Sequence, residues 1–480
     1  MNQFCLLSYK NIEGLIPTFD EAISGGNINT TVIIGPNGSG KSRILSSIID
    51  EFCFLDAIRS GEDRHGKKLR VPAESVELRY RLGGKDCFIK RTGSNLECSV
   101  DDEWVDIAEI PFPRRVAAVS HLPTDRFRFA NRDDSSFYRY LGLRQSTNLT
   151  TTKALETKVL QSLLLGYEQP EFISKFESWL RLAGFTSDVV ISMELASRAL
   201  LSEDFGEFKD AMFSADARRG SVKGRYSQSY IESSIDKIWS LFSLIRGLHW
   251  SLERRPSCAY EFSYLLGEPS NARIWLEGFD LARRWRLFHS VDLVMSKSGG
   301  RFPFSDLSSG EQQLIGTSAR LLSELDSESL IIIDEPEVSL HPEWQIKYIP
   351  TLRECLSTMS AMHVIIATHS HFMVSDLDAE ASALITTGVG GGERASLFDG
   401  AVYGRSPENI LYRVFGVATA GNAAVENDLY QALSMISNRQ DPDVKELALI
   451  YGRLDKVRGK DNAAMNVILD QVRIFLEASE

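Results

Sequence analysis

The stretch Gly35-Pro36-Asn37-Gly38-Ser39-Gly40-Lys41-Ser42 decides the fold of this chain. A mostly apolar run, 31–34, precedes it, and apolar residues at helical spacing, between 44 and 49, follow it. In the order strand, glycine-rich loop and helix, the pattern Gly-x-x-x-x-Gly-Lys-Ser forms a loop that cradles phosphate. The glycines let consecutive backbone N–H groups turn toward an anion, and the helix adds its positive end. The sequence therefore predicts a phosphate-binding loop.

The residues of this loop have separate expected tasks. Lys41 can reach the β- and γ-phosphates of a bound nucleotide, and the Ser42 hydroxyl can ligate Mg²⁺. The remaining contacts would come from Asn37, Gly38, Ser39 and Gly40. A glycine-rich turn could match the pattern by chance, but the flanking strand and helix argue against that reading. We therefore expect ATP and Mg²⁺ as ligands.

Length and composition favour a globular protein of several domains. The chain has 480 residues, of which 43% are hydrophobic and 25% charged, which suggests about two to four domains. No apolar run reaches the roughly 18–20 residues that cross a bilayer, and the first residues do not begin a secretory signal. Six scattered cysteines without a Cys-x-x-Cys pair indicate reduced thiols. These features predict a cytoplasmic protein with no membrane partner.

A phosphate-binding loop that hydrolyses its nucleotide needs an acidic partner, and the segment 330–335 provides one. Four apolar residues, Leu330–Ile333, are followed directly by Asp334 and Glu335. Such a run is typical of a central parallel strand, whose carboxyl end would carry the two acids. Asp334 is expected to hold the Mg²⁺ shell, and Glu335 to polarise the attacking water. The alternative, ordinary carboxylates at a strand end, is disfavoured by the apolar run before them.

The chain alternates between β-rich and helical stretches. Alternating patterns predict a strand near the N-terminus and a β-meander over 74–110. Apolar runs predict further buried strands at 115–120, 363–367 and 382–387. Helical periodicity dominates 150–290. It returns in the C-terminal part, where helices are predicted over 408–415, 423–436, 444–454 and 463–476.

Two arginine-rich segments are candidates for contact with DNA or another polyanion. The net charge of −12 excludes a wholly basic surface but allows a local basic groove. The first segment, 114–144, interleaves arginines with aromatic residues. Arginines that pair with local acids or cover apolar surface explain it equally well. The second, 218–225, contains four basic residues, and a mobile solvated loop is the favoured explanation there.

Further motifs carry a resemblance to a known family. The segment Leu307-Ser308-Ser309-Gly310-Glu311-Gln312-Gln313 resembles the signature motif of ABC-type ATPases, with Ser309 and Glu311 in place of that family's first glycine and its glutamine. Ala367-Thr368-His369-Ser370 resembles the segment that carries its γ-phosphate-sensing histidine, and 335–342 resembles its D-loop. Together with the phosphate-binding loop, this order is similar to the branch of ABC ATPases that holds SMC-like and overcoming-lysogenization-defect-like (OLD-like) proteins.

The resemblance implies an α/β fold, an ABC-type P-loop ATPase head with a helical insertion and a helical C-terminal tail. Residues 1–145 would form the N-terminal part of the head, with the phosphate loop and the β-meander. Residues 146–295 would be the helical insertion, and 296–400 the C-terminal part of the head, with the signature, the acidic pair and the histidine. Residues 401–480 would be a helical region for a partner or for oligomerisation.

Family members bind each nucleotide between two heads, so the resemblance also implies a head-to-tail homodimer, within a higher homo-oligomer. Glu335 and His369 would be catalytic, and Ser308 and Gly310 of the second copy would contact the γ-phosphate. Many members carry a glutamine after the strand that follows the meander, and this chain has none there. His121, Asp125 or water would take its place. This departure puts the rate of hydrolysis in doubt more than the binding of ATP.

Among such ATPases, the chain looks like the stand-alone subunits of bacterial anti-phage defence systems, PtuA-like Septu ATPases first and the PARIS ATPase second. The reason is the tail sequence SPENILYRVFGV, residues 406–417, followed by short helices. Such a subunit would hydrolyse ATP as a sensor and scaffold and control a separate effector nuclease, either HNH-type (PtuB-like) or Toprim-type. Asp376 and Asp378 read as loop carboxylates, so no nuclease site is expected in this chain.

Two other functions stay open from the sequence. The first is a DNA-repair ATPase of the RecF or RecN kind, which clamps DNA. The second is a regulatory nucleotide-binding module with negligible turnover, an interpretation that rests on the missing glutamine.

Overall fold

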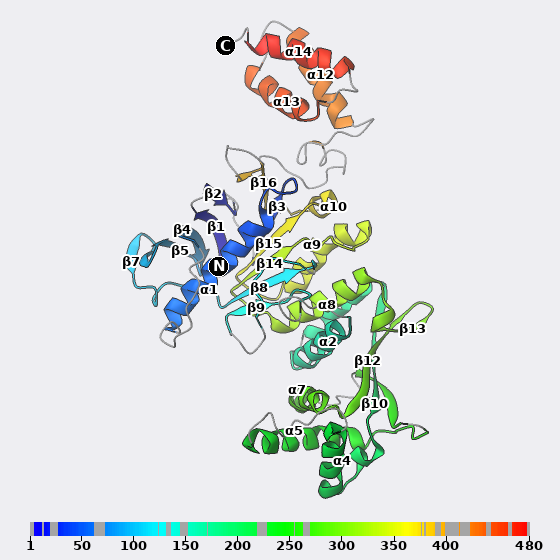
Figure 1. The fold of residues 1–480 in the computed structure, drawn as a ribbon. Helices are drawn as coiled ribbons and strands as arrows, with labels where there is room; N and C mark the ends of the chain where they lie inside the picture. The colour runs from blue at the N-terminus through cyan, green and yellow to red at the C-terminus, as the bar shows by residue number, and fades with distance from the viewer. Residues whose placement is uncertain are drawn as a thin grey trace. The chain divides into compact units, whose positions relative to one another are not determined.

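A computed structural model describes residues 4–11, 14–19, 27–61, 73–122, 124–130, 136–144, 152–169, 171–217, 228–253, 255–262, 269–375, 377–378, 381–388, 395–398, 412, 423–437, 443–458 and 463–477. The chain divides into two compact units. Unit 1 comprises Met1–Tyr140 and Asp326–Glu480, and unit 2 comprises Leu141–Leu325. Figure 1 shows the elements of both, and each unit is described by itself below.

Unit 1 contains a largely parallel sheet with the strand order β17-β16-β3-β15-β14-β8-β9. Only the pairing of β17 with β16 in this sheet is antiparallel within the described residues. The bounds are β3 Ile28–Ile34, β8 Arg115–Ser120, β9 Tyr138–Tyr140, β14 Ser329–Asp334, β15 Met362–Thr368, β16 Ser382–Thr387 and β17 Ala395–Leu397. Every residue of β3, β14 and β15 is buried. These strands can carry continuous apolar runs because both faces are covered, and the buried strands predicted at 115–120, 363–367 and 382–387 are confirmed.

The register of the central strands brings their carboxyl ends together. Asp334 at the end of β14 pairs with Ala367 of β15 and with Ser120 of β8. Thr368, the last residue of β15, pairs with Ile34, the last residue of β3. Parallel strands place their carboxyl ends at one edge of a sheet, which is where open α/β sheets bind ligands. The predicted motifs of this unit therefore share one edge.

Helix α1 (Lys41–Ser60) follows β3 through the glycine-rich loop and packs against the sheet (Figure 1). Its apolar side chains Ile44, Leu45, Ile48, Ile49 and Phe52 are buried in the core of unit 1. The helix ends at Gly61, whose φ of 72° is left-handed, a conformation that glycine adopts at low cost. The helix predicted from the periodicity after residue 41 is therefore confirmed.

An antiparallel sheet in the order β2-β1-β4-β5-β6-β7 completes this part of unit 1. Its strands are β1 Phe4–Asn11, β2 Gly14–Pro17, β4 Ser75–Leu82, β5 Lys85–Thr92, β6 Asn95–Val100 and β7 Glu103–Val105, which confirms the β-meander. A buried ion pair joins it to α1, because Glu51 accepts two hydrogen bonds of 2.6 Å from Arg91. Pairing and full hydrogen bonding offset the cost of burying these charges.

His363 of β15 is a buried connection between the two sheets of unit 1. Its Nδ1 accepts a 2.9 Å hydrogen bond from the Leu6 backbone N–H, and its Nε2 lies 2.9 Å from the Thr31 hydroxyl. The Thr31 hydroxyl also bonds to the Thr18 carbonyl oxygen. Because that oxygen can only accept, Thr31 donates to it, and Nε2–H donates to Thr31. Burial lowers the pKa of His363 to about 3, so this neutral tautomer holds at neutral pH.

The C-terminal segment of unit 1 forms helices α12 (Ala423–Ser437), α13 (Val444–Lys456) and α14 (Ala463–Glu477) around their own apolar cluster. Buried Asp428 accepts hydrogen bonds from Arg453 at 2.9 and 3.1 Å and from the Tyr412 hydroxyl at 3.0 Å. The helices predicted over 423–436, 444–454 and 463–476 are confirmed. The helix predicted over 408–415 lies, apart from residue 412, outside the described residues.

Unit 2 combines helices with an antiparallel sheet in the order β11-β10-β12-β13. The strands are β10 Phe185–Leu195, β11 Ser257–Glu261, β12 Phe288–Lys297 and β13 Gly300–Pro303. The helices are α2 Thr152–Gly166, α3 Phe172–Leu182, α4 Phe205–Ala217, α5 Gln228–Arg246, α7 Pro269–Arg284 and α8 Ser309–Glu324, with the 3₁₀ turns η3 Arg198–Leu201 and η5 Phe304–Asp306. The predicted helical periodicity of 150–290 is confirmed for much of its length, but the sheet was not predicted.

Two general features of the described residues bear on function. The six cysteines, which all fall within the described ranges, are buried and form no disulfide there, as their scattered spacing predicts. The short α10 (His371–Val374) and α9 (Pro342–Leu356) complete the described helices of unit 1. None of the helices in the described ranges is long and apolar enough to span a lipid bilayer.

Candidate nucleotide-binding and hydrolysis site

The loop between β3 and α1 adopts a conformation that its glycines make possible. Gly38 and Gly40 have φ angles of 81° and 92°, in the left-handed region. At Gly35 a Cβ would lie 2.5 Å from the Thr387 carbonyl oxygen and closer still to the Thr387 hydroxyl. The end of β16 therefore packs against the loop without room for a side chain.

Thr387 also holds the loop through hydrogen bonds. Its hydroxyl donates to the Ile34 carbonyl oxygen at 3.0 Å, and the Ser39 hydroxyl lies 2.8 Å from it. Because the single hydroxyl proton of Thr387 goes to Ile34, Ser39 is the donor in the second bond. Sequence reasoning did not identify Thr387, since it lies some 350 residues after the loop in the chain.

Lys41 is the cation at the base of the loop, and its side chain is almost fully buried. The ammonium donates to the Gly35 carbonyl oxygen at 2.9 Å and to that of Pro36 at 3.3 Å, and it lies 2.8 Å from Nε2 of His369. Burial lowers the pKa of Lys41, while the carboxyls of Glu335 and Asp334 oppose that shift. The ammonium is a partly desolvated charge that polyphosphate oxygens can satisfy.

Ser42 and Asp334 form a pair of hard oxygen donors. The Ser42 hydroxyl donates to Asp334 Oδ1 at 3.0 Å, across β3 and β14. Burial raises the pKa of Asp334 to about 6, and the nearby carboxylate of Glu337 adds to the shift. Mg²⁺ takes one or two protein oxygens and fills its octahedron with phosphate oxygens and water. This pair fits that requirement, and a divalent cation would relieve the crowding of negative charge.

Glu335 follows Asp334 with a φ of 51°, in the left-handed region. Its Oε1 lies 3.1 Å from Nε2 of His369, the nitrogen that also faces Lys41. Burial, and then the carboxylate of Glu337, raise the pKa of Glu335 above its ordinary value. Burial and the charge of Lys41 lower the pKa of His369. Glu335 and neutral His369 therefore form an acid–base pair beside the lysine.

Glu337 holds the backbone of His369 in place. Its Oε1 accepts a hydrogen bond of 2.5 Å from the backbone N–H of His369. The next residue, Ser370, caps α10 and donates to Gln345 of α9 at 2.6 Å. In the predicted D-loop, Ser339 has a φ of 65° and is exposed, and His341 caps α9. Side chains therefore hold the backbone of His369 and the starts of α9 and α10.

These groups line one cavity of about 350 Å³. The predicted residues that the structure brings together there are Asn37, Gly38, Gly40, Lys41, Ser42, Glu335 and His369. Asp334 lies directly behind Ser42. Arg126 also lines the cavity, although sequence reasoning placed it only in an arginine-rich segment. This cavity at the carboxyl edge of the parallel sheet can hold a polyphosphate.

The predicted signature begins α8 in unit 2, as the motif predicts. The Ser308 hydroxyl accepts the Glu311 N–H at 3.3 Å, and the Glu311 carboxylate accepts the Ser308 N–H at 2.8 Å. These two bonds form a capping box, in which the Glu311 carboxylate at the third helical position satisfies the N-cap backbone. Lys297 holds the same carboxylate at 2.8 Å. Ser308 is exposed, and Gly310 is buried.

The candidate substitutes for the missing glutamine lie in different environments. His121 is fully buried against Tyr348, and burial lowers its pKa to about 4. Asp125 accepts hydrogen bonds from the Phe127 N–H at 3.0 Å and from the Tyr140 hydroxyl at 2.5 Å. Neither residue lines the cavity. Asp378, predicted to be a loop carboxylate, pairs with Arg353 at 3.0 Å.

The arginine-rich segments divide by their contacts. Arg115 pairs with Asp326 at 3.0 Å, and the Arg128 guanidinium lies 5.9 Å from the Tyr138 ring centre. These contacts agree with the interpretation that arginines of the first segment pair with local acids or cover apolar surface. Arg126 instead faces the cavity. Arg132, and the second segment at 218–225, lie outside the described residues.

A lysine in a glycine loop, joined at one sheet edge by a serine, an aspartate, a glutamate and a histidine, is the arrangement that a P-loop ATPase site requires. Residues 204–375 match the family model described as "AAA domain, putative AbiEii toxin, Type IV TA system". This match indicates an ATPase-type domain in that part of the chain, and the chain is also similar to retron ATPases and to a Septu protein.

Among its relatives is the "Retron Vc95 probable ATPase" of Vibrio cholerae, 21% identical over 80% of this chain and 73% of that protein. Another is the "Septu protein PtuA" of Bacillus thuringiensis, 32% identical over 26% of this chain and 31% of that protein. The chain also aligns with the Smc head domain of Pyrococcus furiosus at a TM-score of 0.34 and 13% identity, over 83% of this chain and 96% of that one.

Proposed function

We propose that this chain is a cytoplasmic ATPase that binds ATP with Mg²⁺, hydrolyses it, and acts as the sensor and scaffold of an anti-phage complex. The observation that carries the proposal is the convergence of Lys41, Ser42, Asp334, Glu335 and His369 at one sheet edge. Its relation to retron ATPases and to PtuA supports the defence role.

The proposed roles follow from the contacts. Lys41 exchanges the Gly35 and Pro36 carbonyl oxygens for phosphate oxygens, which compete well because they carry charge. Ser42 and Asp334 would hold Mg²⁺, which neutralises charge that develops on the phosphates. Glu335 polarises the attacking water, and His369 orients it, since Glu337 fixes the histidine backbone.

Arg126 supplies an additional cation in this proposal, and Arg126→Ala tests it. We expect the Kd for a non-hydrolysable ATP analogue to rise about tenfold, since a charged hydrogen bond contributes about 1.5–3 kcal/mol. Arg128→Ala is the matched control, because Arg128 lies two residues away and packs on Tyr138 instead of lining the cavity. Titration calorimetry measures both. Equal affinities for Arg126→Ala and the wild type would remove Arg126 from the site.

We further propose a head-to-tail homodimer in which Ser308 and Gly310 of a second copy complete each ATP site. In a Glu335→Gln background, which retains ATP, light scattering is expected to show dimers when ATP and Mg²⁺ are added. Ser308→Asp in that background should abolish them. Aspartate accepts the Glu311 N–H as well as serine does, but it loses the 2.9 Å hydrogen bond that the Ser308 hydroxyl donates to the Glu311 carboxylate. Its negative charge opposes the γ-phosphate.

The control for this experiment is Ser305→Asp, an exposed position before the same helix. It should dimerise like the background. If ATP does not change the measured mass of the Glu335→Gln chain, the proposed dimer is wrong. If dimers still form with Ser308→Asp, the proposed role of the signature is wrong.

The partner we propose is a separate effector nuclease, of the HNH or the Toprim type, within a higher homo-oligomer. An HNH or Toprim gene next to this one, with a product that co-purifies with the chain, is the expected finding. Binding to duplex DNA that needs ATP but no partner, measured by gel shift at about 150 mM salt, would instead support a DNA-clamping repair ATPase.

A further inference from the structure

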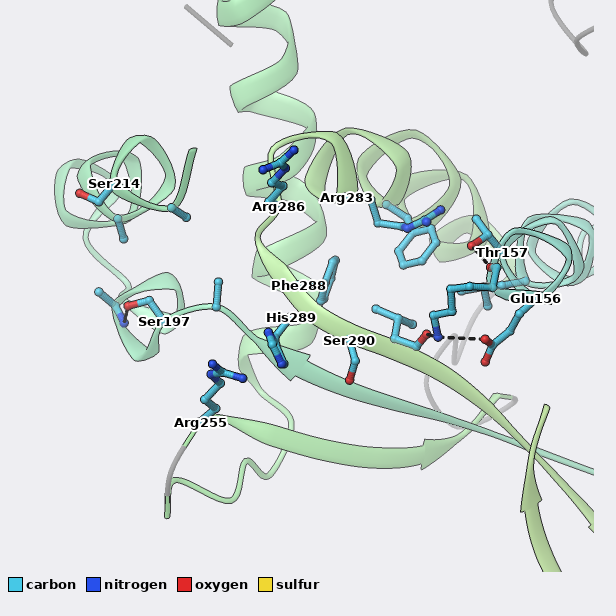
Figure 2. A pocket seen from close by; sticks show the side chains of 18 of the residues that line it. Glu156, Thr157, Ser197, Ser214, Arg255, Arg283, Arg286, Phe288, His289 and Ser290 are labelled. Carbon is cyan, nitrogen blue, oxygen red and sulfur yellow. Dashed lines mark hydrogen bonds and ion pairs between the residues drawn. The ribbon is translucent and has the colours of Figure 1, made fainter. Parts of the chain in front are cut away.

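Unit 2 contains a second, larger cavity of about 820 Å³, between α2, α4, the end of α7 and β12 (Figure 2). Small-molecule sites commonly have volumes of about 300–1,000 Å³. We infer that this cavity binds a phosphorylated ligand of the nucleotide class, separately from the ATP site of unit 1. The inference goes beyond the proposed function, because no step of ATP hydrolysis uses these residues.

One wall of the cavity is fixed by a buried carboxylate. Glu156 of α2 accepts a hydrogen bond of 2.6 Å from the Leu293 backbone N–H and one of 2.9 Å from Lys153. Lys153 also donates to Asp292 at 2.6 Å and to the Val291 carbonyl oxygen. These bonds hold α2 against β12, so the cavity has a preformed wall. Each oxygen of Glu156 therefore already accepts one hydrogen bond.

Arg283 at the end of α7 is the cation that points to an anionic ligand. The carboxylates that act on it are Asp280 and Glu156. Both oxygens of Asp280 accept from the Gln161 side chain, at 2.7 and 2.6 Å, and Glu156 is held as described. Among the described residues, no carboxylate lies within 4.0 Å of the Arg283 guanidinium. The Arg283 guanidinium lies 5.8 Å from the ring centre of Phe279, which also lines the cavity. A ring face leaves the N–H groups without an acceptor, and the nearby acids already have other partners, so these N–H groups remain available to an anion.

Further donors reach the cavity from three places in the sequence (Figure 2). Arg255 precedes β11, Arg286 lies between α7 and β12, and His289 is exposed on β12. Arg255 also pairs with Glu194 at 3.1 Å, which anchors it beside the sheet. Guanidinium groups match phosphate geometry and bind it with paired hydrogen bonds. Several of them around one cavity favour phosphate over a neutral ligand.

The opposite wall carries acids. Glu207 and Asp210 of α4 line the cavity, and both are exposed. A nucleotide offers groups for both walls, because its phosphate is anionic while its ribose hydroxyls and base amino groups donate hydrogen bonds. Inorganic phosphate would use only the arginine side. The combination of charges therefore favours a nucleotide, either free or at the end of a nucleic-acid strand.

The test uses the full-length chain with Lys41→Ala, so that the ATP site of unit 1 does not contribute. Titration calorimetry with AMP is expected to show one saturable site per chain. Arg283→Ala in the same background should weaken binding about tenfold, the loss of one charged hydrogen bond. Arg273→Ala is the matched control, since Arg273 lies on the same helix, outside the cavity, and pairs with Glu277 at 3.0 Å. It should bind as the background does.

A 5′-phosphorylated hexanucleotide distinguishes the two sources of the ligand. Tighter binding of the hexanucleotide than of AMP assigns the cavity to strand ends, and the reverse assigns it to free nucleotides. If neither probe binds the Lys41→Ala chain, or if Arg283→Ala and Arg273→Ala bind alike, the inference is wrong. A failure of the ATP site itself would appear instead as equal binding of ATP by the wild type and by the Lys41→Ala chain.

Discussion

Lys41→Ala is expected to raise the Kd for ATP at least about 100-fold. The Lys41 ammonium is buried, and its hydrogen-bond partners among the described residues are the Gly35 and Pro36 carbonyl oxygens and neutral His369. Two charge-assisted bonds to phosphate contribute about 1.5–3 kcal/mol each, and each 1.4 kcal/mol is tenfold in affinity. Titration calorimetry with a non-hydrolysable ATP analogue measures the loss.

Two companion variants make this result specific. Lys41→Met keeps most of the buried stem without the charge, so it should lose affinity as Lys41→Ala does while avoiding a cavity. Lys347→Ala removes an exposed lysine of α9 that pairs only with Glu343 at 2.6 Å among the described residues, and it should bind like the wild type. An unchanged Kd for both Lys41 variants would show that the loop does not cradle the phosphates.

Glu335→Gln is expected to lower steady-state ATP hydrolysis about 100- to 10,000-fold, the range in which a general base contributes. Its affinity for ATP should stay within about threefold of the wild type, because Lys41 and the loop keep their contacts. The carboxyl lies beside His369, at 3.1 Å, and Gln retains its size but cannot accept a proton. A phosphate-release assay, together with the calorimetric Kd, separates turnover from binding.

Glu343→Gln is the control for hydrolysis, since Glu343 is an exposed residue of α9 that pairs with Lys347. It should turn over ATP at the wild-type rate. If the wild-type chain binds ATP but shows no turnover that Glu335→Gln lowers, that result would support a regulatory nucleotide-binding module without catalysis. Equal turnover in both variants and in the wild type would remove Glu335 from the reaction.

The local motifs could be predicted because each one is recognised from the residues that directly precede and follow it in the chain. The glycine loop, the acids after β14 and the histidine after β15 each follow an apolar strand. Since parallel strands share one carboxyl edge, three separate motifs predict one site without any distance being known. The helix start at Ser308 was likewise predictable, because capping depends on residues three apart.

Contacts between distant segments could not be predicted in this way. Arg126 and Arg128 are alike in the sequence, yet one lines the cavity and the other packs on Tyr138. Thr387 meets the glycine loop only because β16 pairs with β3. The sheet of unit 2 was missed because β10 and β12 are about 100 residues apart and lie among segments with helical periodicity.

By itself, the sequence determined the class of chemistry: a phosphate-binding loop, an acidic pair and a histidine, each read from its own strand. Only the tertiary structure decided which cations serve it and where a second ligand can bind. The physical reason is that a charge acts according to its partners. Arg283 has the same local pattern as any helical arginine, and the engagement of Asp280 by Gln161 is what leaves it available.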